Sequence, residues 1–207
     1  MTTLPPSRER VVLGLLHSVE QDANRSQRTL ANEFGVALGL VNTTLRYCVR
    51  KGYVKVRRVP ARRYTYFLTP KGLAEKTRLT VAHVSRSLSF FRQARKDCEQ
   101  AFAHAETRGW LRIAIAGGGE LADIAFLCSD GRRAKLMGMI QPPPHEVSFR
   151  GMPVVDAADS LPRLDAVIVT DLVNPQQTYD RLAADMPADR VLALDVLRIT
   201  TASRRTT

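Results

Sequence analysis

The 207-residue sequence has few cysteines and no long apolar segment. Its three cysteines, Cys48, Cys98 and Cys128, lie far apart and lack the spacing of a disulfide framework or a zinc site. We therefore expect three small buried side chains in a reducing compartment. No run of about 18 apolar residues is present, so a transmembrane helix is not expected. The first residues lack the apolar core of a signal peptide. These features predict a cytoplasmic protein without a membrane partner.

The sequence also lacks a recognisable set of catalytic or metal-binding side chains. Its four histidines are scattered, and neither they nor the cysteines have the spacing of metal ligands. No nucleophile and no acid–base pair stands beside a motif that would use it. The sequence therefore predicts a protein that is not an enzyme and holds no metal.

Positive charge, in contrast, is abundant and concentrated in the first half of the chain. The net charge is +11. Residues 1–110 contain 20 Lys and Arg against 8 Asp and Glu, whereas residues 111–207 contain 11 against 12. Such a segregated excess is typical of a phosphate-binding surface. The alternative is a generally basic, soluble protein, which the segregation of the charge disfavours.

The most informative segment runs from Ser26 to Leu68. Ser26 is a good helix N-cap, and Gly35 suits the end of the short helix that follows. The predicted elements are helices over residues 27–34 and 38–51, and strands over residues 53–58 and 63–68 on either side of a turn at Pro60. Helix, tight turn, helix and hairpin is the layout of a winged helix-turn-helix, whose second helix enters the major groove of DNA.

The second of these helices has an apolar and a polar face. The spacing i, i+4, i+7, i+8 predicts a buried stripe made of Val41, Leu45, Cys48 and Val49. The opposite face carries side chains of the types that reach base edges and phosphates. The candidates for DNA contact are that face, the start of the preceding helix and the arginines around Pro60, namely Asn42, Thr43, Arg46, Tyr47, Arg50, Ser26, Gln27, Arg28, Arg57, Arg58, Arg62 and Arg63. The alternatives are a solvated helix face and a solubilising loop.

A long helix is expected after the hairpin. Thr69 is a suitable N-cap, Pro70 suits the first helical position, and only Gly72 interrupts the pattern from residue 71 to residue 108. Such a helix is about 54 Å long. Its apolar stripe, at nearly coiled-coil spacing, consists of Leu73, Val81, Val84, Leu88, Phe91, Cys98 and Phe102. We interpret it as a dimerisation helix; the alternative is a helix that lies across the second domain. A first helix is expected from Ser7 through Leu16.

Four short motifs in this half resemble one known family. They are residues 26–31, 39–42, 50–55 and 66–72, and the last two contain Lys-Gly-Tyr-Val and Leu-Thr-Pro-Lys-Gly. The motifs resemble those of MarR-type winged-helix regulators, above all the subgroup associated with exopolysaccharide gene clusters in bacteria. The resemblance covers about residues 9–91. It implies a dimeric regulator that binds double-stranded DNA.

After Trp110 the pattern changes to apolar strands that alternate with helices. An isoleucine-rich run over residues 111–116 leads into Gly117-Gly118-Gly119-Glu120-Leu121-Ala122 and then an apolar helix through residue 127. Strand, glycine turn and helix is the context of the dinucleotide fingerprint G-x-G-x-x-G/A. Further strands are predicted over residues 134–140, 166–170 and 191–196, and helices over 175–184 and 156–161. This alternation predicts a small parallel, Rossmann-like sheet.

Two details argue against plain NAD at this glycine turn. The second strand ends in Gln141 and three prolines rather than near an acidic residue that would hold a ribose. Glu120 would compete with a pyrophosphate for the same helix dipole. The candidate ligand residues are Gly117, Gly118, Gly119, Glu120, Gln141, Asp171 and Asn174, with His145 and Glu146 at the same edge. For the polar residues among them, an ordinary loop is the alternative.

This half also resembles the amino-terminal nucleotide-binding domains of sugar acyltransferases and of CoA-binding proteins. The shared features are the strand with its Gly-x-Gly turn and a later element at residues 149–154. The resemblance implies a fold more than a ligand. A nucleotide, a nucleotide-sugar, CoA and a dinucleotide all stay open as the ligand.

The predicted fold class is an α+β winged helix-turn-helix with a long dimerisation helix, followed by an α/β Rossmann-like parallel-sheet domain. The expected boundaries are residues 1–70, 71–109 and 110–199, with a disordered tail over 200–207. The predicted function is a dimeric regulator that reads a palindromic operator and responds to a nucleotide-type small molecule. Two alternatives stay open. One is a nucleotide- or sugar-modifying enzyme that uses the winged helix for protein interaction. The other is a regulator whose second domain is a ligand-free oligomerisation scaffold.

Overall fold

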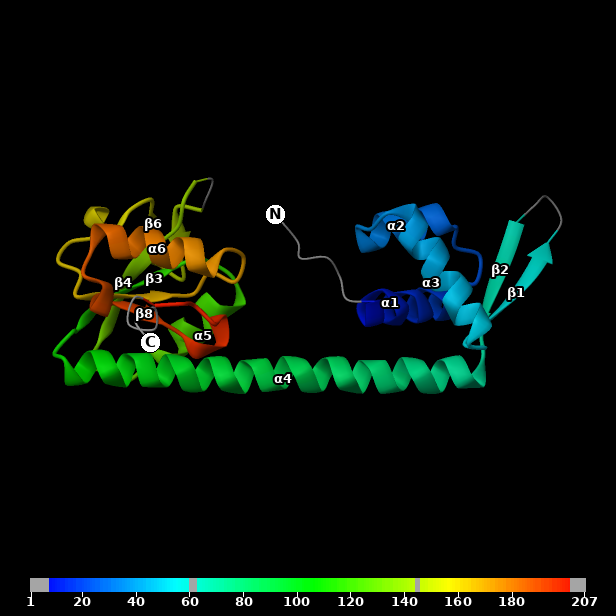
Figure 1. The fold of residues 1–207 in the computed structure, drawn as a ribbon, viewed down its shortest axis with the longest axis horizontal. Helices are drawn as coiled ribbons and strands as arrows, with labels where there is room; N and C mark the ends of the chain where they lie inside the picture. The colour runs from blue at the N-terminus through cyan, green and yellow to red at the C-terminus, as the bar shows by residue number, and fades with distance from the viewer. Residues whose placement is uncertain (1–7, 60–62, 144–145, 202–207) are drawn as a thin grey trace. The chain divides into compact units, whose positions relative to one another are not determined.

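The computed structural model describes residues 8–59, 63–143 and 146–201. The chain divides into two compact units, residues 1–87 and residues 88–207, and helix α4 (Pro70–Thr107) continues from the first into the second. Each unit is described by itself below (Figure 1). No helix in the described residues has the length and apolar character needed to cross a membrane.

The first unit has the predicted order of helices and hairpin. It contains α1 (Arg8–Gln21), α2 (Gln27–Phe34), α3 (Leu38–Arg50), β1 (Val54–Val59), β2 (Arg63–Leu68) and the start of α4. The Ser26 hydroxyl accepts a hydrogen bond from the Thr29 N–H at 3.1 Å, and Gly35 adopts a left-handed conformation with φ of 61°. The predicted bounds of α2 are therefore confirmed. Helix α1 extends beyond the expected end at Leu16.

One hydrophobic core holds the first unit together. Leu15 and Leu16 of α1 pack with Leu30 of α2, Val41 of α3 and other buried side chains of the hairpin and α4. The hairpin is also tied to the α1–α2 loop, because the N–H of residue 66 in β2 donates to the carbonyl of residue 23 at 2.9 Å. These contacts fix the hairpin beside the helix-turn-helix.

Helix α4 begins as the sequence predicts, but its apolar stripe is buried in one part and exposed in another. The Thr69 hydroxyl accepts a hydrogen bond from the Gly72 N–H at 3.0 Å and caps the helix. Cys98 and Phe102 are fully buried in the core of the second unit. The prediction that they belong to a dimer interface is therefore wrong. The rest of the stripe is between 40 and 60% exposed, namely Leu73, Val81, Val84, Leu88 and Phe91.

The second unit is built on a six-stranded sheet in the order β5-β6-β4-β3-β7-β8. The strands are β3 (Arg112–Ala116), β4 (Lys135–Ile140), β5 (Ser148–Phe149), β6 (Met152–Val155), β7 (Ala166–Val169) and β8 (Val191–Ala193). All neighbours are parallel except β5 and β6, which form a hairpin. Counting the parallel strands alone, the order is 3-2-1-4-5, so the chain reverses direction across the sheet between β3 and β7.

Helices cover both faces of this sheet (Figure 1). Ile113 and Ile115 of β3 face the carboxyl half of α4 and helix α5 (Glu120–Cys128), whereas Ala114 and Ala116 face helix α6 (Pro175–Asp185). The alternation follows from the two-residue period of a strand. An α/β unit with a largely parallel sheet is therefore present.

Several predicted details of this unit are corrected. The helix expected over residues 156–161 is a short 3₁₀ turn, Ala158–Ser160, and the strand expected over 191–196 ends at Ala193. The sequence did not predict the β5–β6 hairpin. Thr200, where the disordered tail was expected to begin, donates its N–H to the Gln176 side chain at 2.9 Å, and residues 202–207 lie outside the described residues.

Two of the three thiols are buried as the sequence predicts, and the third is not fully buried. Cys48 and Cys98 are buried, and Cys128 is half-buried. Burial raises the pKa of the Cys98 thiol to about 12, which keeps it protonated and unreactive at neutral pH. Within the described part of the chain, no group of three or more His, Cys, Asp or Glu side chains could hold a metal ion.

Candidate nucleic-acid interface and glycine turn

Helix α3 presents a polar face to solvent. Its buried side consists of Val41, Thr44, Leu45 and Cys48. Thr43, Arg46 and Arg50 are exposed, and Asn42 is half-buried beside them. The Thr43 hydroxyl donates to the Gly39 carbonyl at 2.8 Å, so it is bonded within the helix. The predicted polar face is therefore largely as expected.

Two residues of α3 lie on a different side from the predicted one. Val49, expected in the core, is 39% exposed. It follows Asn42 by seven residues, about two helical turns, and so points in nearly the same direction. Tyr47, expected on the exposed face, is half-buried and stacks edge-on against Tyr53 with ring centroids 6.4 Å apart. The apolar Val49 therefore belongs to the candidate DNA face, and Tyr47 lies at its margin.

The hairpin register separates the two arginines at the end of β1. Arg58 pairs with Tyr64, on the face that also carries Val56, whereas Arg57 pairs with Thr65 on the opposite face. Both arginines are exposed. Arg62 lies outside the described residues, and of Arg63 only the backbone is described. The proposed contacts of these last two side chains stay predictions.

A groove of about 520 Å³ runs between α3 and the inner face of the hairpin. Polar side chains from α2 and α3 line it together with apolar and aromatic side chains from α3 and the hairpin. The lining residues are Gln27, Asn42, Leu45, Arg46, Val49, Arg50, Val56, Tyr64 and Tyr66. The Gln27 amide donates to the Tyr66 hydroxyl at 3.2 Å, which fixes the start of α2 against the hairpin. Val56 and Tyr64 are exposed in this groove and were not among the predicted contacts, although the period of two along each strand places them on this face.

The start of α2 contributes unequally to this surface. The Ser26 hydroxyl is engaged in the helix cap and lies 2.8 Å from the Thr29 hydroxyl. Gln27 lines the groove, and Arg28 is exposed. The structure therefore brings Gln27 together with the α3 side chains, whereas it gives Ser26 a capping role.

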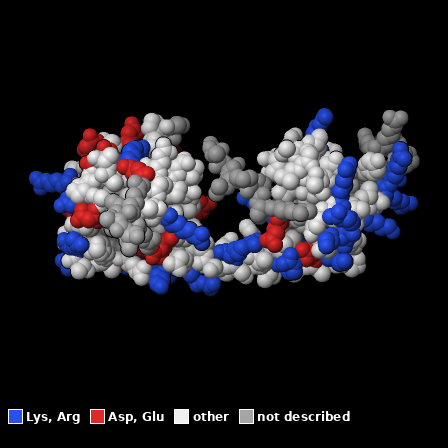
Figure 2. Space-filling view, viewed as in Figure 1, with Lys and Arg blue, Asp and Glu red and all other residues white. Residues whose placement is uncertain are grey.

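The charge of the protein belongs to the unit that carries this groove. Residues 1–87 hold 16 Lys and Arg against 5 Asp and Glu, whereas residues 88–207 hold 15 of each. Between residues 34 and 74 the chain has nine Lys and Arg and no acidic residue. Figure 2 shows the basic side chains gathered over α3 and the hairpin. The groove therefore lies in a strongly electropositive surface.

In the second unit the glycine turn connects β3 to α5 at the point where the strand order reverses. Gly117 and Gly119 both have φ of 101°, a conformation that side chains rarely adopt. A Cβ on Gly117 would lie 2.6 Å from the Asp171 backbone, and a Cβ on Gly118 would lie 2.8 Å from the Gln141 amide oxygen. The turn is therefore packed closely against two of the predicted ligand residues, while the space at Gly119 is open.

The polar residues near the turn have structural contacts of their own. The Asp171 carboxylate accepts hydrogen bonds from the N–H groups of Val173 and Asn174 at 2.7 and 3.1 Å, and from the Thr178 hydroxyl at 2.7 Å. It thereby holds the loop that begins α6. The Glu120 side chain is exposed in the first turn of α5. His145 lies outside the described residues, and Glu146 is exposed.

The β5–β6 hairpin covers α5. Arg150, between the two strands, donates to the Asp123 carboxylate at 2.8 Å, and Phe149 stacks edge-on against Phe126 with centroids 6.3 Å apart. This hairpin is the later element that the sequence resemblance singled out at residues 149–154. Gly151, with φ of 80°, is the turn signal that could have located it.

Comparison with known proteins gives partial matches only. No family model and no curated protein matches the chain. Among solved structures, a MarR-family transcription regulator is 21% identical with a TM-score of 0.34, over 39% of this chain and 54% of that one. The S. aureus MepR–DNA complex is 20% identical with a TM-score of 0.34, over 42% of this chain and 61% of that one. A MarR regulator from Methanosarcina mazei Go1 is 20% identical with a TM-score of 0.33, over 39% and 61%.

This chain therefore spans between 54 and 61% of the length of those structures. The solved structures similar to it include MarR-family transcription regulators, over about 40% of its residues.

Proposed function

We propose that this protein is a DNA-binding transcription regulator that places helix α3 in the major groove. The observation that carries the proposal is the exposed face of α3 beside a hairpin, in a segment of 41 residues with nine Lys and Arg and no acidic residue. A helix fits the major groove, which is about 12 Å wide. The sequence-independent attraction of phosphates for such a surface supplies most of the non-specific affinity.

On this proposal some side chains of α3 contact base edges and others contact phosphates. Arg46 matches the two acceptors of guanine, and Asn42 matches the donor and acceptor of adenine. Val49, on the same face, suits the methyl group of thymine. Arg50 and the hairpin arginines suit the phosphate backbone, which positions a protein without reading sequence. Specificity on this proposal resides in Asn42, Arg46 and Val49.

The protein acts as a dimer on this proposal, joined through α4. Val81, Val84, Leu88 and Phe91 follow the three-and-four spacing of a coiled coil and are between 40 and 60% exposed. Exposed apolar side chains in a contiguous row are typical of an interaction surface. A twofold dimer presents two α3 helices and therefore reads a palindromic operator.

The second unit would bind a nucleotide-type effector at the glycine turn. Support comes from the strand order, because open parallel sheets bind ligands at the carboxyl ends of strands where that order reverses. A ligand that binds only the native state raises the melting temperature, so a thermal-shift screen with NAD(H), CoA esters, nucleotides and nucleotide-sugars tests this part. The structural role of Asp171 and the acidic Glu120 and Asp123 in the first turn of α5 favour the alternative of a ligand-free scaffold.

Selection from a library of random duplexes tests the DNA-binding proposal directly. We expect wild-type protein to enrich a palindromic site, and the Arg46→Ala variant to lose that enrichment while retaining its affinity for random duplex. A Lys135→Ala variant, which removes an exposed positive charge from the second unit, is the control and should select the same site. Wild-type protein that enriches no sequence over the starting library would exclude operator reading.

A further inference from the structure

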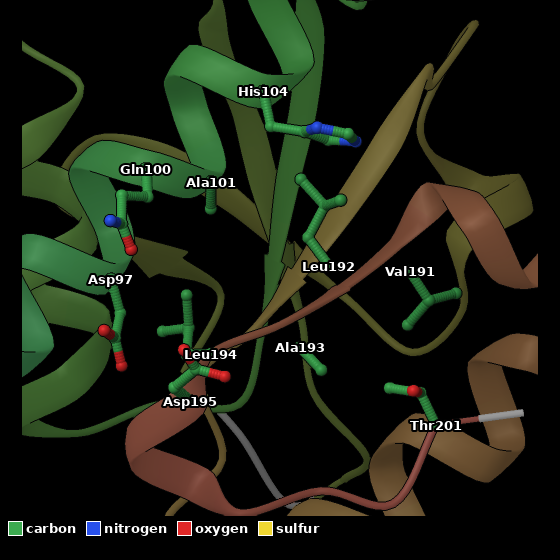
Figure 3. A pocket seen from close by; sticks show the side chains of 10 residues that line it. All are labelled: Asp97, Gln100, Ala101, His104, Val191, Leu192, Ala193, Leu194, Asp195 and Thr201. Carbon is green, nitrogen blue, oxygen red and sulfur yellow. The ribbon is translucent and has the colours of Figure 1, made fainter. Parts of the chain in front are cut away.

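A cavity in the second unit is lined by none of the residues of the glycine turn. It has a volume of about 270 Å³ and lies between α4 and β8, the edge strand of the sheet (Figure 3). Asp97, Gln100, Ala101 and His104 of α4 form one wall. The opposite wall is the segment 191–195, with Thr201 beside it. A volume of this size corresponds to about nine waters.

Asp97 is the unusual member of this lining. Asp97 is buried, with only 4% of its surface exposed. One carboxylate oxygen accepts from the Gln93 amide at 2.7 Å, and the other accepts from the Val196 N–H at 2.7 Å. Both donors are neutral, and no Lys or Arg among the described residues forms an ion pair with Asp97. A buried carboxylate is ordinarily paired with a cation, so this one lacks its usual partner.

The remaining lining defines what could supply that partner. Each carboxylate oxygen of Asp97 accepts one hydrogen bond and has capacity for a second. Gln100 and His104 offer further polar groups at the exposed rim. Leu192 and Leu194 on the opposite wall, and Ala101 on the α4 wall, are the apolar part of the lining. No Lys or Arg lines the cavity in the described part of the chain. The site therefore favours a donor-bearing cation with a small apolar body and disfavours an anion.

We propose that this cavity binds a small organic cation, a primary ammonium or guanidinium group on a short apolar body, with Asp97 as its counter-ion. The cationic group donates to the Asp97 carboxylate, and the apolar body packs against Leu192 and Leu194. This site is separate from the glycine turn and requires neither DNA binding nor a nucleotide-type effector.

Titration of the 207-residue chain with n-butylammonium chloride, followed by ¹H–¹⁵N NMR, tests the proposal. We expect the amide signals of Gln100, Ala193 and Leu194 to shift with a Kd of about 1 mM or tighter. Two probes of the same size, neutral 1-butanol and anionic butyrate, should shift them far less. Absence of saturable shifts at these residues, or equal binding of butanol, would overturn the proposal.

Variants locate the site and its charge requirement. Asp97→Asn keeps the size of the side chain and should weaken butylammonium binding by about 10- to 100-fold. Ala101→Leu fills the cavity from the same α4 wall, one helical turn after Asp97, keeps the Asp97 carboxylate and should weaken binding at least as much. Asp159→Asn removes an exposed carboxylate from a 3₁₀ turn in the same unit and should leave affinity unchanged. If Asp97→Asn fails to fold, Ala101→Leu decides, and wild-type affinity in that variant would refute the site.

Discussion

The two arginines that end strand β1 provide a quantitative test of how the hairpin meets DNA. Arg58 pairs with Tyr64 on the inner face, where Tyr64 also lines the groove beside α3, whereas Arg57 lies on the outer face. If the inner face rests on the DNA backbone, Arg58 contacts a phosphate and Arg57 does not. We therefore expect Arg58→Ala and Arg57→Ala to differ, although the two residues are adjacent and both are exposed.

The size of the difference follows from counterion release. Each phosphate contact contributes about 0.9 to the slope of log K against log salt concentration on duplex DNA. A dimer has two hairpins, so Arg58→Ala should reduce the slope by about 1.8. When salt rises from about 50 to 200 mM, the binding constant of the wild-type protein should therefore fall about tenfold more than that of Arg58→Ala. Arg57→Ala should leave the slope nearly unchanged.

Fluorescence anisotropy with a labelled random-sequence duplex measures these slopes and requires no knowledge of the operator. Arg133→Ala, which removes an exposed charge from the second unit, is the matched control and should preserve the wild-type slope. Substitutions at exposed positions change stability by about 0.5 kcal/mol or less, so melting curves should coincide. An unchanged slope for Arg58→Ala would place the hairpin off the DNA. Equal reductions for Arg57→Ala and Arg58→Ala would refute the assignment of faces.

Four further outcomes are expected. Arg46→Ala should weaken binding to a selected operator by about 1–3 kcal/mol and leave random-duplex binding nearly intact; an equal loss on both would show a phosphate contact only. Gly72→Ala places a Cβ 2.0 Å from the Tyr53 carbonyl oxygen. Urea unfolding should therefore show the first unit destabilised by about 3 kcal/mol, the upper end of the usual cost of overpacking. Undiminished stability would contradict this close approach. Leu88→Glu should raise the dimer dissociation constant about tenfold or more in sedimentation equilibrium, because it places a charge in an apolar seam. Hydrogen bonds from two backbone N–H groups lower the pKa of Glu106. The ionised carboxylate therefore stabilises the fold above the ordinary glutamate pKa of about 4.3, and this contribution is lost as the pH falls below it. Glu106→Gln should lose less stability than wild type on acidification, as measured by chemical unfolding at each pH.

Features set by local chemistry were predictable from the sequence. Ser26 and Gly35 mark the bounds of α2 because a hydroxyl cap and a left-handed glycine each act within one helical turn. The Thr69 cap and the glycine turn after β3 are of the same kind. In each case the residues that cause the structure lie within a few positions of the structure that they cause.

Features that depend on a partner distant in sequence were not predictable in the same way. The burial of Tyr47 and the exposure of Val49 depend on where the rest of the unit covers α3, which the helical period alone does not settle. The capping role of Asp171 requires Thr178 and the start of α6 to be placed first. The β5–β6 hairpin has one two-residue strand, too short to give a periodic signal. The cavity at Asp97 lies between α4 and the edge strand β8, so its position depends on the strand order of the sheet.

The division of the α4 stripe limits any dimer that the helix forms. Positions that share one face of a coiled-coil register are exposed from residue 81 to residue 91 and buried in the second unit from residue 98 onward. The free part of the face is therefore about 15 Å long, roughly one and a half heptads. Isolated helices shorter than about 12–15 residues are marginal in water, but α4 is already held in helical form by the cores at both ends. The free energy of association therefore does not have to offset the entropy cost of forming the helix. A short apolar seam needs to offset only the cost of bringing two chains together.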